Sequence, residues 1–107
     1  MRKLDLTPYD VTVLTPEGPK TQAYDVSRSL GVVLFNPELR LGALELLESQ
    51  DLIKKIRAVD GNYVLLEEAE FAKVEAAVKA ARGYNENDAE FVRRILYAPK
   101  IDIVPKE

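Results

Sequence analysis

Two prolines and a glycine lie within the six residues Thr15–Lys20, between two strand-like runs near the start of the chain. Because proline and glycine interrupt regular structure and favour tight turns, this segment predicts a reversal of the chain. The run before it, Tyr9–Leu14, is rich in β-branched side chains and alternates between two faces. The run after it, Thr21–Val26, can return as a second strand. The sequence therefore predicts an N-terminal β-hairpin.

Strand-like residues also occur at both ends of the chain. Near the start, Lys3–Thr7 precedes Pro8, which favours an edge strand or an arm. Near the end, Lys100–Val104 alternates at its start and predicts a closing strand that pairs with the hairpin. With three to five helices packed on one face of this sheet, the predicted fold class is α+β. A sheet covered on one face leaves strand edges that are open to a partner.

Residues 26–59 have a helical pattern. The first helix is expected to begin near Asp25 or Ser27, since either side chain can accept backbone N–H bonds as an N-cap, and to end at Asn36-Pro37. A second helix can begin at Pro37, and one of its faces is expected to carry Leu39, Ala43, Leu46 and Leu47. The pattern continues to Val59 and is compatible with either one helix or two over residues 37–59.

Two more helices are predicted after a short strand-like run, Tyr63–Leu66. In the first of them, apolar side chains recur at helical spacing, and Gly83 supplies the C-terminal stop; the apolar residues are Phe71, Val74, Val78 and Ala81. The last helix is expected to begin with Asn87 as N-cap and Glu90 three residues later, which is the spacing of a capping box. It is expected to end at Ala98-Pro99.

The composition limits the chemistry that this chain can perform. Of its 107 residues, 47% are apolar and 31% are charged, which is typical of a single folded domain over residues 1–107. The chain contains neither Cys nor His, so disulfides, thiolate nucleophiles, histidine metal ligands and a Ser-His-Asp triad are excluded. We therefore expect a protein that is not an enzyme and that uses no cofactor.

Charge and hydropathy narrow the class of partner. The net charge is −3 and the sequence has no basic stripe, so nucleic-acid binding is not expected. No apolar run approaches the roughly 20 residues that span a bilayer, and the first residues lack the apolar region of a signal peptide. Together with the lack of Cys, these features favour a cytoplasmic protein without membrane contact.

Acidic side chains cluster at Glu67, Glu68 and Glu70, with Glu75 further along the chain. Carboxylate oxygens can bind Mg²⁺ or Ca²⁺, but consecutive residues on a helix point about 100° apart and do not converge. Acidic residues in the first turn also stabilise a helix, because they face the positive end of its dipole. We interpret the cluster as a helix start and predict no metal site.

A basic and aromatic patch on the last predicted helix is a candidate ligand-binding site. Arg93 and Tyr97 are four residues apart and share a helix face, Arg94 lies beside them, and Lys100 follows. Arginine and tyrosine together can hold a phosphate or stack on a base. The alternative is that the arginines are cations near a helix C-terminus that pair with Glu90.

Tyrosines are candidates for a protein interface. Tyr9, Tyr24 and Tyr84 are predicted to take part, because tyrosine offers a large contact area and a polar tip at low entropic cost. Tyr84 is the first choice among them, since it follows Gly83 in a connection. The same tyrosines can instead complete the core of a chain that has no Trp.

Three segments together carry a resemblance to a known group of proteins. They are Glu38–Leu41 leading into Glu45–Leu47, then Tyr63–Glu68, and Asn87–Pro99. In order and patterning, these segments resemble short proteins encoded by tailed bacteriophages and prophages. The resemblance implies a phage accessory or assembly protein that acts by binding in the host cytoplasm.

The sequence therefore supports two hypotheses of function. The leading one is a non-catalytic protein–protein interaction module that self-associates or docks on a larger partner. The alternative is a small-ligand or nucleotide-binding protein that uses the patch formed by Arg93, Arg94, Tyr97 and Lys100.

Overall fold

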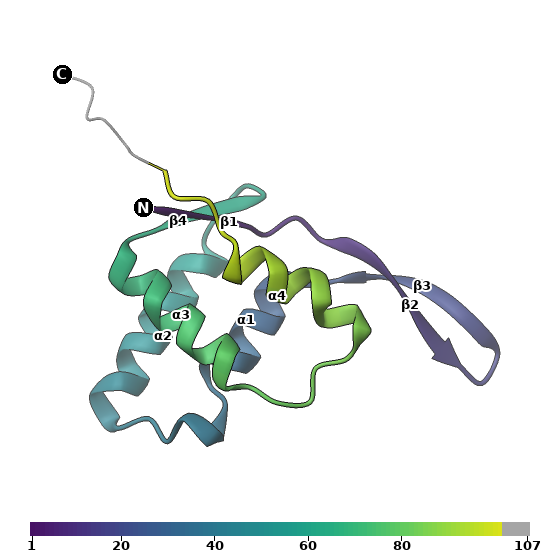
Figure 1. Ribbon diagram of the computed structural model, residues 1–107, viewed down its shortest axis with the longest axis horizontal. Coiled ribbons are helices and arrows are strands. Elements are labelled where there is room, and N and C mark those ends of the chain that lie inside the picture. Colours follow the sequence, from purple (N-terminus) through teal and green to yellow (C-terminus); the bar gives the residue numbers. More distant parts are fainter. Residues whose placement is uncertain (102–107) are drawn as a thin grey trace.

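A computed structural model describes residues 1–101 of the chain and has an α+β fold (Figure 1). This part of the chain contains four α-helices and two small antiparallel sheets of two strands each. The helices pack together around one apolar core, and a β-hairpin projects from this body (Figure 1). The predicted fold class, α+β, is confirmed.

The predicted N-terminal hairpin is also confirmed. Strand β2 (Tyr9–Thr15) pairs antiparallel with β3 (Gly18–Tyr24), and Tyr9 stands opposite Tyr24 at the base of the hairpin. At the tip, Gly18 adopts a φ of 113°, a backbone conformation that strains any residue with a side chain. The glycine and prolines of the turn therefore fix where the chain reverses.

The second sheet is built around the first strand of the chain. Strand β1 (Arg2–Asp5) pairs antiparallel with β4 (Tyr63–Leu66), which confirms the short strand expected before the third helix. On the other edge of β1, the backbone N–H of Lys3 donates to the carbonyl of Pro99 at 3.0 Å, and Met1 and Ile101 exchange backbone bonds. The first residues of the chain are thus held on both sides.

The partner predicted for the closing segment is wrong for its described residues, because Lys100 and Ile101 lie against the start of the chain and not against the hairpin. Lys100 forms a single β-bridge to Arg2, and residues 102–104 of the expected strand lie outside the described residues. A side-chain contact explains the choice of partner: the guanidinium of Arg2 donates to the carbonyl of Ala98 at 2.9 Å and so fixes the exit of the last helix beside β1.

The first helix, α1 (Val26–Leu34), begins where the sequence predicts. The side chain of Asp25 caps it by accepting a hydrogen bond of 3.1 Å from the N–H of Arg28. Beyond its C-terminus, Asn36 and Pro37 divert the chain, as expected, into a short 3₁₀ helix over Pro37–Leu39.

Residues 37–59 contain this 3₁₀ helix and a single α-helix, α2 (Ala43–Arg57). The apolar pattern expected for this segment is confirmed in part. Leu46 and Leu47 are exposed, whereas Leu39 packs against the core and the continuation of the pattern toward Val59 is buried, at Leu52, Ile53 and Ile56. The 3₁₀ helix and the loop after it reorient the chain before α2 starts. As a result α2 meets the core only through its C-terminal half.

The last two helices are α3 (Glu68–Ala80) and α4 (Ala89–Leu96), and Gly83 after α3 has a φ of 88° that favours glycine. The cap predicted for α4 is wrong. Asn85, not Asn87, forms a capping box with Asp88, and the box opens a 3₁₀ helix that runs directly into α4. The observed pair, Asn85 and Asp88, has the same three-residue spacing as the predicted pair, Asn87 and Glu90, and lies two residues earlier in the chain.

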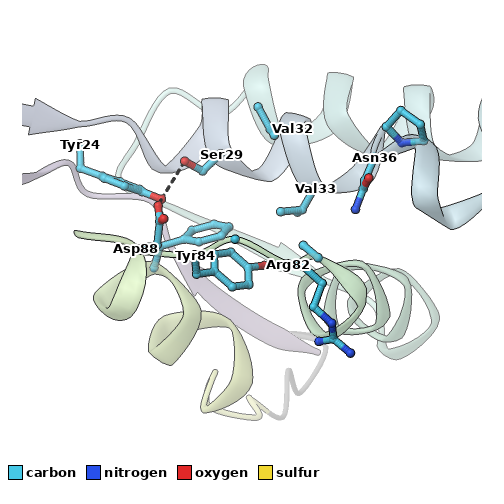
Figure 2. A pocket seen from close by; sticks show the side chains of 12 residues that line it. Tyr24, Ser29, Val32, Val33, Asn36, Arg82, Tyr84 and Asp88 are labelled. Carbon is cyan, nitrogen blue, oxygen red and sulfur yellow. Dashed lines mark hydrogen bonds between the residues drawn. The ribbon is translucent and has the colours of Figure 1, made fainter. Parts of the chain in front are cut away.

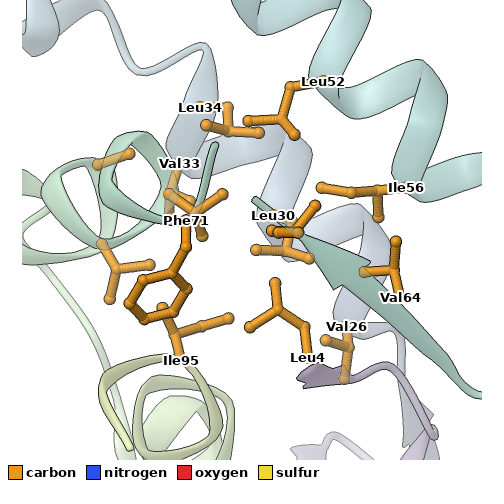
Figure 3. Packing of buried hydrophobic residues seen from close by; sticks show 14 of the residues in the cluster. Leu4, Val26, Leu30, Val33, Leu34, Leu52, Ile56, Val64, Phe71 and Ile95 are labelled. Atoms are coloured by element: carbon orange, nitrogen blue, oxygen red, sulfur yellow. The ribbon is translucent and has the colours of Figure 1, made fainter. Parts of the chain in front are cut away.

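The core lies where the four helices meet the β1–β4 sheet (Figure 3). Leu4 and Leu66 enter it from the sheet and Leu30 from α1, and all three are fully buried. Phe91 and Ile95 close it from α4. The hairpin contributes little to this core, because every residue of β3 between its two ends is exposed.

Candidate functional site

The tyrosines at the base of the hairpin face each other. The rings of Tyr9 and Tyr24 stack with their centroids 4.7 Å apart and their planes at 14°. Both side chains are half-buried, and the ring of Tyr24 lies 6.1 Å from that of the buried Phe91. Two of the three tyrosines predicted for an interface are thus brought together within the molecule, where they attach the hairpin to the helices.

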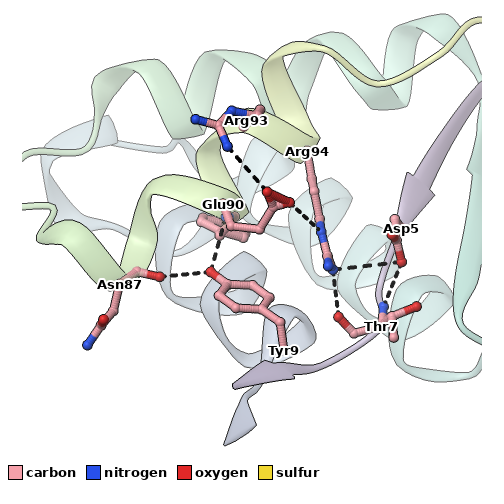
Figure 4. Close-up of polar contacts among 8 residues, drawn as sticks. Asp5, Thr7, Tyr9, Asn87, Glu90, Arg93 and Arg94 are labelled. Atoms are coloured by element: carbon pink, nitrogen blue, oxygen red, sulfur yellow. Dashed lines mark hydrogen bonds and ion pairs between the residues drawn. The ribbon is translucent and has the colours of Figure 1, made fainter. Parts of the chain in front are cut away.

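The hydroxyl of Tyr9 strengthens this attachment (Figure 4). It donates to the carbonyl of Asn87 at 2.8 Å and accepts a hydrogen bond of 3.1 Å from the N–H of Phe91. The first N–H groups of a helix have no partner within the helix, and Phe91 lies in the first turn of α4. Tyr9 therefore caps α4 from a strand that is 82 residues away along the chain.

Tyr24 makes a second polar attachment between the hairpin and the helices (Figure 2). Its hydroxyl donates to Oδ1 of Asp88 at 2.5 Å and accepts a bond of 2.9 Å from the hydroxyl of Ser29. Burial, followed by the bond to the Asp88 carboxylate, raises the pKa of Tyr24 far above its ordinary value. Burial likewise raises the pKa of Tyr9.

The raised pKa values of Tyr9 and Tyr24 predict that the protein loses stability in alkali. Below about pH 10, tyrosine is protonated in both the folded and the unfolded chain. Above it, the unfolded chain releases the protons of Tyr9 and Tyr24, whereas the folded chain retains them because both pKa values are raised. The free energy of unfolding should therefore fall from about pH 10 upwards.

The measurement is urea unfolding at a series of alkaline pH values, with Tyr24→Phe as the control. The variant lacks the ionisable hydroxyl, so its free energy of unfolding should fall less steeply above pH 10 than that of the parent. The two proteins differ only at this side chain, so the contributions of the other titratable groups cancel in the comparison. Equal slopes in the two proteins would contradict the prediction.

Tyr84 borders a cleft of about 330 Å³ between α1 and the connection that precedes α4 (Figure 2). Its hydroxyl donates to the carbonyl of Val78 at 2.8 Å, and 39% of the residue is exposed. Burial raises the pKa of Tyr84. It is the most accessible of the three tyrosines predicted for an interface, and Val32 on α1 is exposed at the same cleft.

Arg94 occupies the centre of a compact polar cluster (Figure 4). Its guanidinium donates to the carbonyl of Thr7 at 2.6 Å and to the carboxylate of Glu90 at 3.1 Å, and lies 3.7 Å from that of Asp5. It also lies over the ring of Tyr9, 5.0 Å from the centroid. Burial acts to raise the pKa of Asp5, but hydrogen bonds from Thr7 and the charge of Arg94 outweigh it and leave this pKa lowered.

The other residues of the predicted ligand patch do not converge with Arg94. The side chain of Arg93 is 67% exposed and approaches only Glu90, at 3.5 Å, whereas that of Arg94 is 16% exposed. Tyr97 is 79% exposed, and Lys100 bridges to β1 through its backbone. Five clefts in residues 1–101 are lined by other residues and by none of these four. The cation best placed to hold a phosphate is already committed to contacts within the chain.

The acidic cluster forms a helix start, as interpreted from the sequence. Glu67 is the N-cap of α3 and shares a capping box with Glu70, whose carboxylate also accepts a bond of 2.7 Å from Lys55. Burial acts to raise the pKa of Glu70, but these hydrogen bonds outweigh it and leave the pKa lowered. Glu68 pairs with Arg2. Within residues 1–101, acidic side chains do not gather in the groups of three that would suit a metal ion.

Sequence reasoning missed a leucine surface on the first two turns of α2. Leu44, Leu46 and Leu47 are 70%, 47% and 56% exposed, and we call these three residues the α2 leucine surface. Leu46 and Leu47 have the spacing of an apolar helix face, which is why the sequence predicts them on one face of this helix. Only the tertiary structure shows that no other element covers this part of α2.

Comparison with protein-family models, with curated proteins and with solved structures gives no match. None of the helices in residues 1–101 has the length and apolar character that a membrane crossing requires.

Proposed function

We propose that the protein is a non-catalytic interaction module that associates with a second copy of itself through α2. The observation that carries this proposal is the exposure of the α2 leucine surface, Leu44, Leu46 and Leu47. Single exposed apolar residues are common on monomers, but three large ones within four residues of one helix, two of them on a shared face, leave apolar surface of the kind that marks an interface.

The free energy of transfer from water to an apolar environment favours burial of these leucines. Moving a leucine side chain from water into a packed environment is worth about 1.5–3 kcal/mol. Leu44 and Leu47 are three residues apart and so lie on one face of α2, whereas Leu46 points about 100° away from Leu47 around the helix. A partner that covers the patch gains several kcal/mol of apolar burial, which is enough to offset part of the entropic cost of association.

The order of charges along α2 favours a second copy as the partner. Glu45 lies in the first turn of α2 and Asp51 just past its middle, whereas Lys54 and Arg57 lie in its last turn; these four residues form no ion pair within residues 1–101. Two α2 helices that pack antiparallel place the acidic start of each against the basic end of the other. The same arrangement aligns opposite ends of the two helix dipoles, and it is a self-complementary interface with twofold symmetry.

The proposal is tested by the oligomeric state. We expect light scattering and sedimentation to give twice the mass of one chain as concentration rises, and we expect Leu44→Ser combined with Leu47→Ser to restore the monomer. Leu14→Ser is the matched control, because Leu14 is 86% exposed but lies near the hairpin tip. A parent protein that stays monomeric throughout, or a double variant that dimerises as well as the control, would refute it.

A further inference from the structure

The outer edge of β2 is nearly unpaired. The carbonyl of Thr12 accepts a hydrogen bond of 3.2 Å from the side-chain amide of Asn87, on the side of β2 that faces away from β3. Since alternate residues of a strand direct their backbone groups to opposite edges, Asp10, Thr12 and Leu14 all present N–H and C=O groups outward. Within residues 1–101, these outward groups form no other hydrogen bond.

A groove follows this edge. Its volume is about 770 Å³. It runs between β2, which lines it over residues 9–14, and the start of α4 with the segment before it, which line it with Asn85, Glu86, Asn87 and Glu90. Six residues of an extended chain span about 20 Å. The groove therefore follows the strand over a length at which an extended segment can pair with it.

The charges that line the groove are all acidic. They belong to Asp10, Glu86 and Glu90, and no lysine or arginine lines it. Glu90 is balanced by Arg93 and Arg94, but Asp10 and Glu86 form no ion pair within the described part of the chain. Complementarity of charge therefore favours a basic occupant.

The opposite edge of the hairpin is protected in a way that β2 is not. The register places Pro19, Thr21 and Ala23 outward on β3, and Pro19 has no N–H to offer. A proline on an edge strand, here followed by Lys20, is a common means of preventing strand addition. On β2, only the side chain of Asn87 occupies the corresponding position.

We propose that the outer edge of β2 binds an extended, lysine- or arginine-bearing segment of a partner protein as an added strand. The amide of Asn87 donates to Thr12 where the backbone N–H of that strand would donate, and the strand displaces it. A two-stranded hairpin is only marginally stable by itself, so a third strand also stabilises the projecting arm. This site is separate from the α2 leucine surface and does not depend on it.

The test uses the full chain, labelled with ¹⁵N, and two blocked seven-residue peptides. One peptide has lysine at alternate positions with threonine between them, and the other has glutamate in place of lysine. We expect the lysine peptide to shift the amide signals of Asp10, Thr12 and Leu14, and to bind at least about tenfold more tightly than the glutamate peptide, because like charges repel in the groove. Equal binding of the two peptides, or no binding of either, overturns the proposal.

Two proline variants separate pairing at this edge from general attraction of charge. Thr12 and Thr21 stand directly opposite each other, and the N–H of each points outward. Thr12→Pro removes a donor from the β2 edge, and Thr21→Pro removes the equivalent donor from the β3 edge. We expect the first variant to lose binding of the lysine peptide and the second to retain it. Loss in both variants while the signals of the hairpin are intact contradicts strand addition.

A second pair of variants keeps the proposal testable if either proline disturbs the hairpin. Asp10→Lys combined with Glu86→Lys should abolish the preference for the lysine peptide, and an unchanged preference refutes the role of the acidic groove. Asn87→Ala removes the competing donor and should tighten binding about fivefold, as expected for one hydrogen bond. A monomeric protein would refute association through α2 and leave these results unaffected, so the two proposals fail separately.

Discussion

Replacement of Phe91 by alanine should lower the free energy of unfolding by about 3–5 kcal/mol, the range for truncation of a large buried side chain. Phe91 is fully buried and heads the largest such side chains in the core. Truncation removes its apolar surface from the core and leaves a cavity between α4 and the elements packed on it. The neighbouring residues are held by helix and sheet backbones, so the structure can close only part of that cavity.

Phe91→Ala should also destabilise the hairpin. The ring of Phe91 lies beside that of Tyr24, and the N–H of Phe91 donates to the hydroxyl of Tyr9. Any shift of α4 into the cavity therefore displaces both partners of the stacked tyrosine pair. We expect backbone amides in β2 to exchange with solvent faster in the variant, in addition to the global loss of stability.

Urea unfolding followed by circular dichroism gives the first quantity, and hydrogen exchange gives the second. Val92→Ala is the matched control, because Val92 is the next residue on the same helix but is only half-buried. Val92→Ala should lower the free energy of unfolding by markedly less than Phe91→Ala does. A loss below about 1 kcal/mol for Phe91→Ala would show that the core does not close around α4 as the structure indicates.

Local signals in the sequence account for most of the helices and strands. The turn at the hairpin tip needs glycine at position 18, and Asp25 caps α1; each feature depends on residues that are close in sequence. The start of α4 shows the limit of such signals. Two segments with the same spacing, one beginning at Asn85 and one at Asn87, compete for the cap, and contacts of Asn87 with β2 and Tyr9 decide the outcome.

Tertiary contacts decided the features that the sequence could not predict. Lys100 bridges to β1 next to the contact between Arg2 and the carbonyl of Ala98, and that contact joins residues 96 positions apart. The leucines of α2 have the spacing of a core face, and only the path of the 3₁₀ helix before them leaves that face uncovered. Periodicity identifies an apolar face but does not say whether another element covers it.

The candidate sites were predicted less completely than the fold, for the same physical reason. Arg93 and Arg94 are neighbours with the same chemistry, and nothing in the local sequence distinguishes them. In the folded chain, however, the partners of Arg94 include Asp5 and Thr7, which lie at the other end of the sequence. Tyr9 and Tyr24 were candidates either for an interface or for completing the core, and they stack on each other because the hairpin register sets them directly opposite.

This difference between adjacent arginines leads to a second large expected effect. Arg94→Ala should lower the free energy of unfolding by roughly 3 kcal/mol, whereas Arg93→Ala should change it by no more than about 0.5 kcal/mol. Arg94 donates a charged hydrogen bond to the carbonyl of Thr7, which is worth about 1.5–3 kcal/mol, and its position over the ring of Tyr9 adds about 0.5–1 kcal/mol. Its ion pairs add little, because Glu90 and Asp5 are both substantially exposed.

A lysine at this position separates charge from geometry. Arg94→Lys keeps the positive charge, but it cannot bond Thr7 and Glu90 at once from a planar fork, so it should recover less than half of the lost stability. Hydrogen exchange should show that the loss is concentrated where Thr7 leads into β2, because Arg94 ties this connection to α4. Arg94→Ala that is as harmless as Arg93→Ala would mean that the guanidinium is free in solution, and would return it to consideration as a ligand contact.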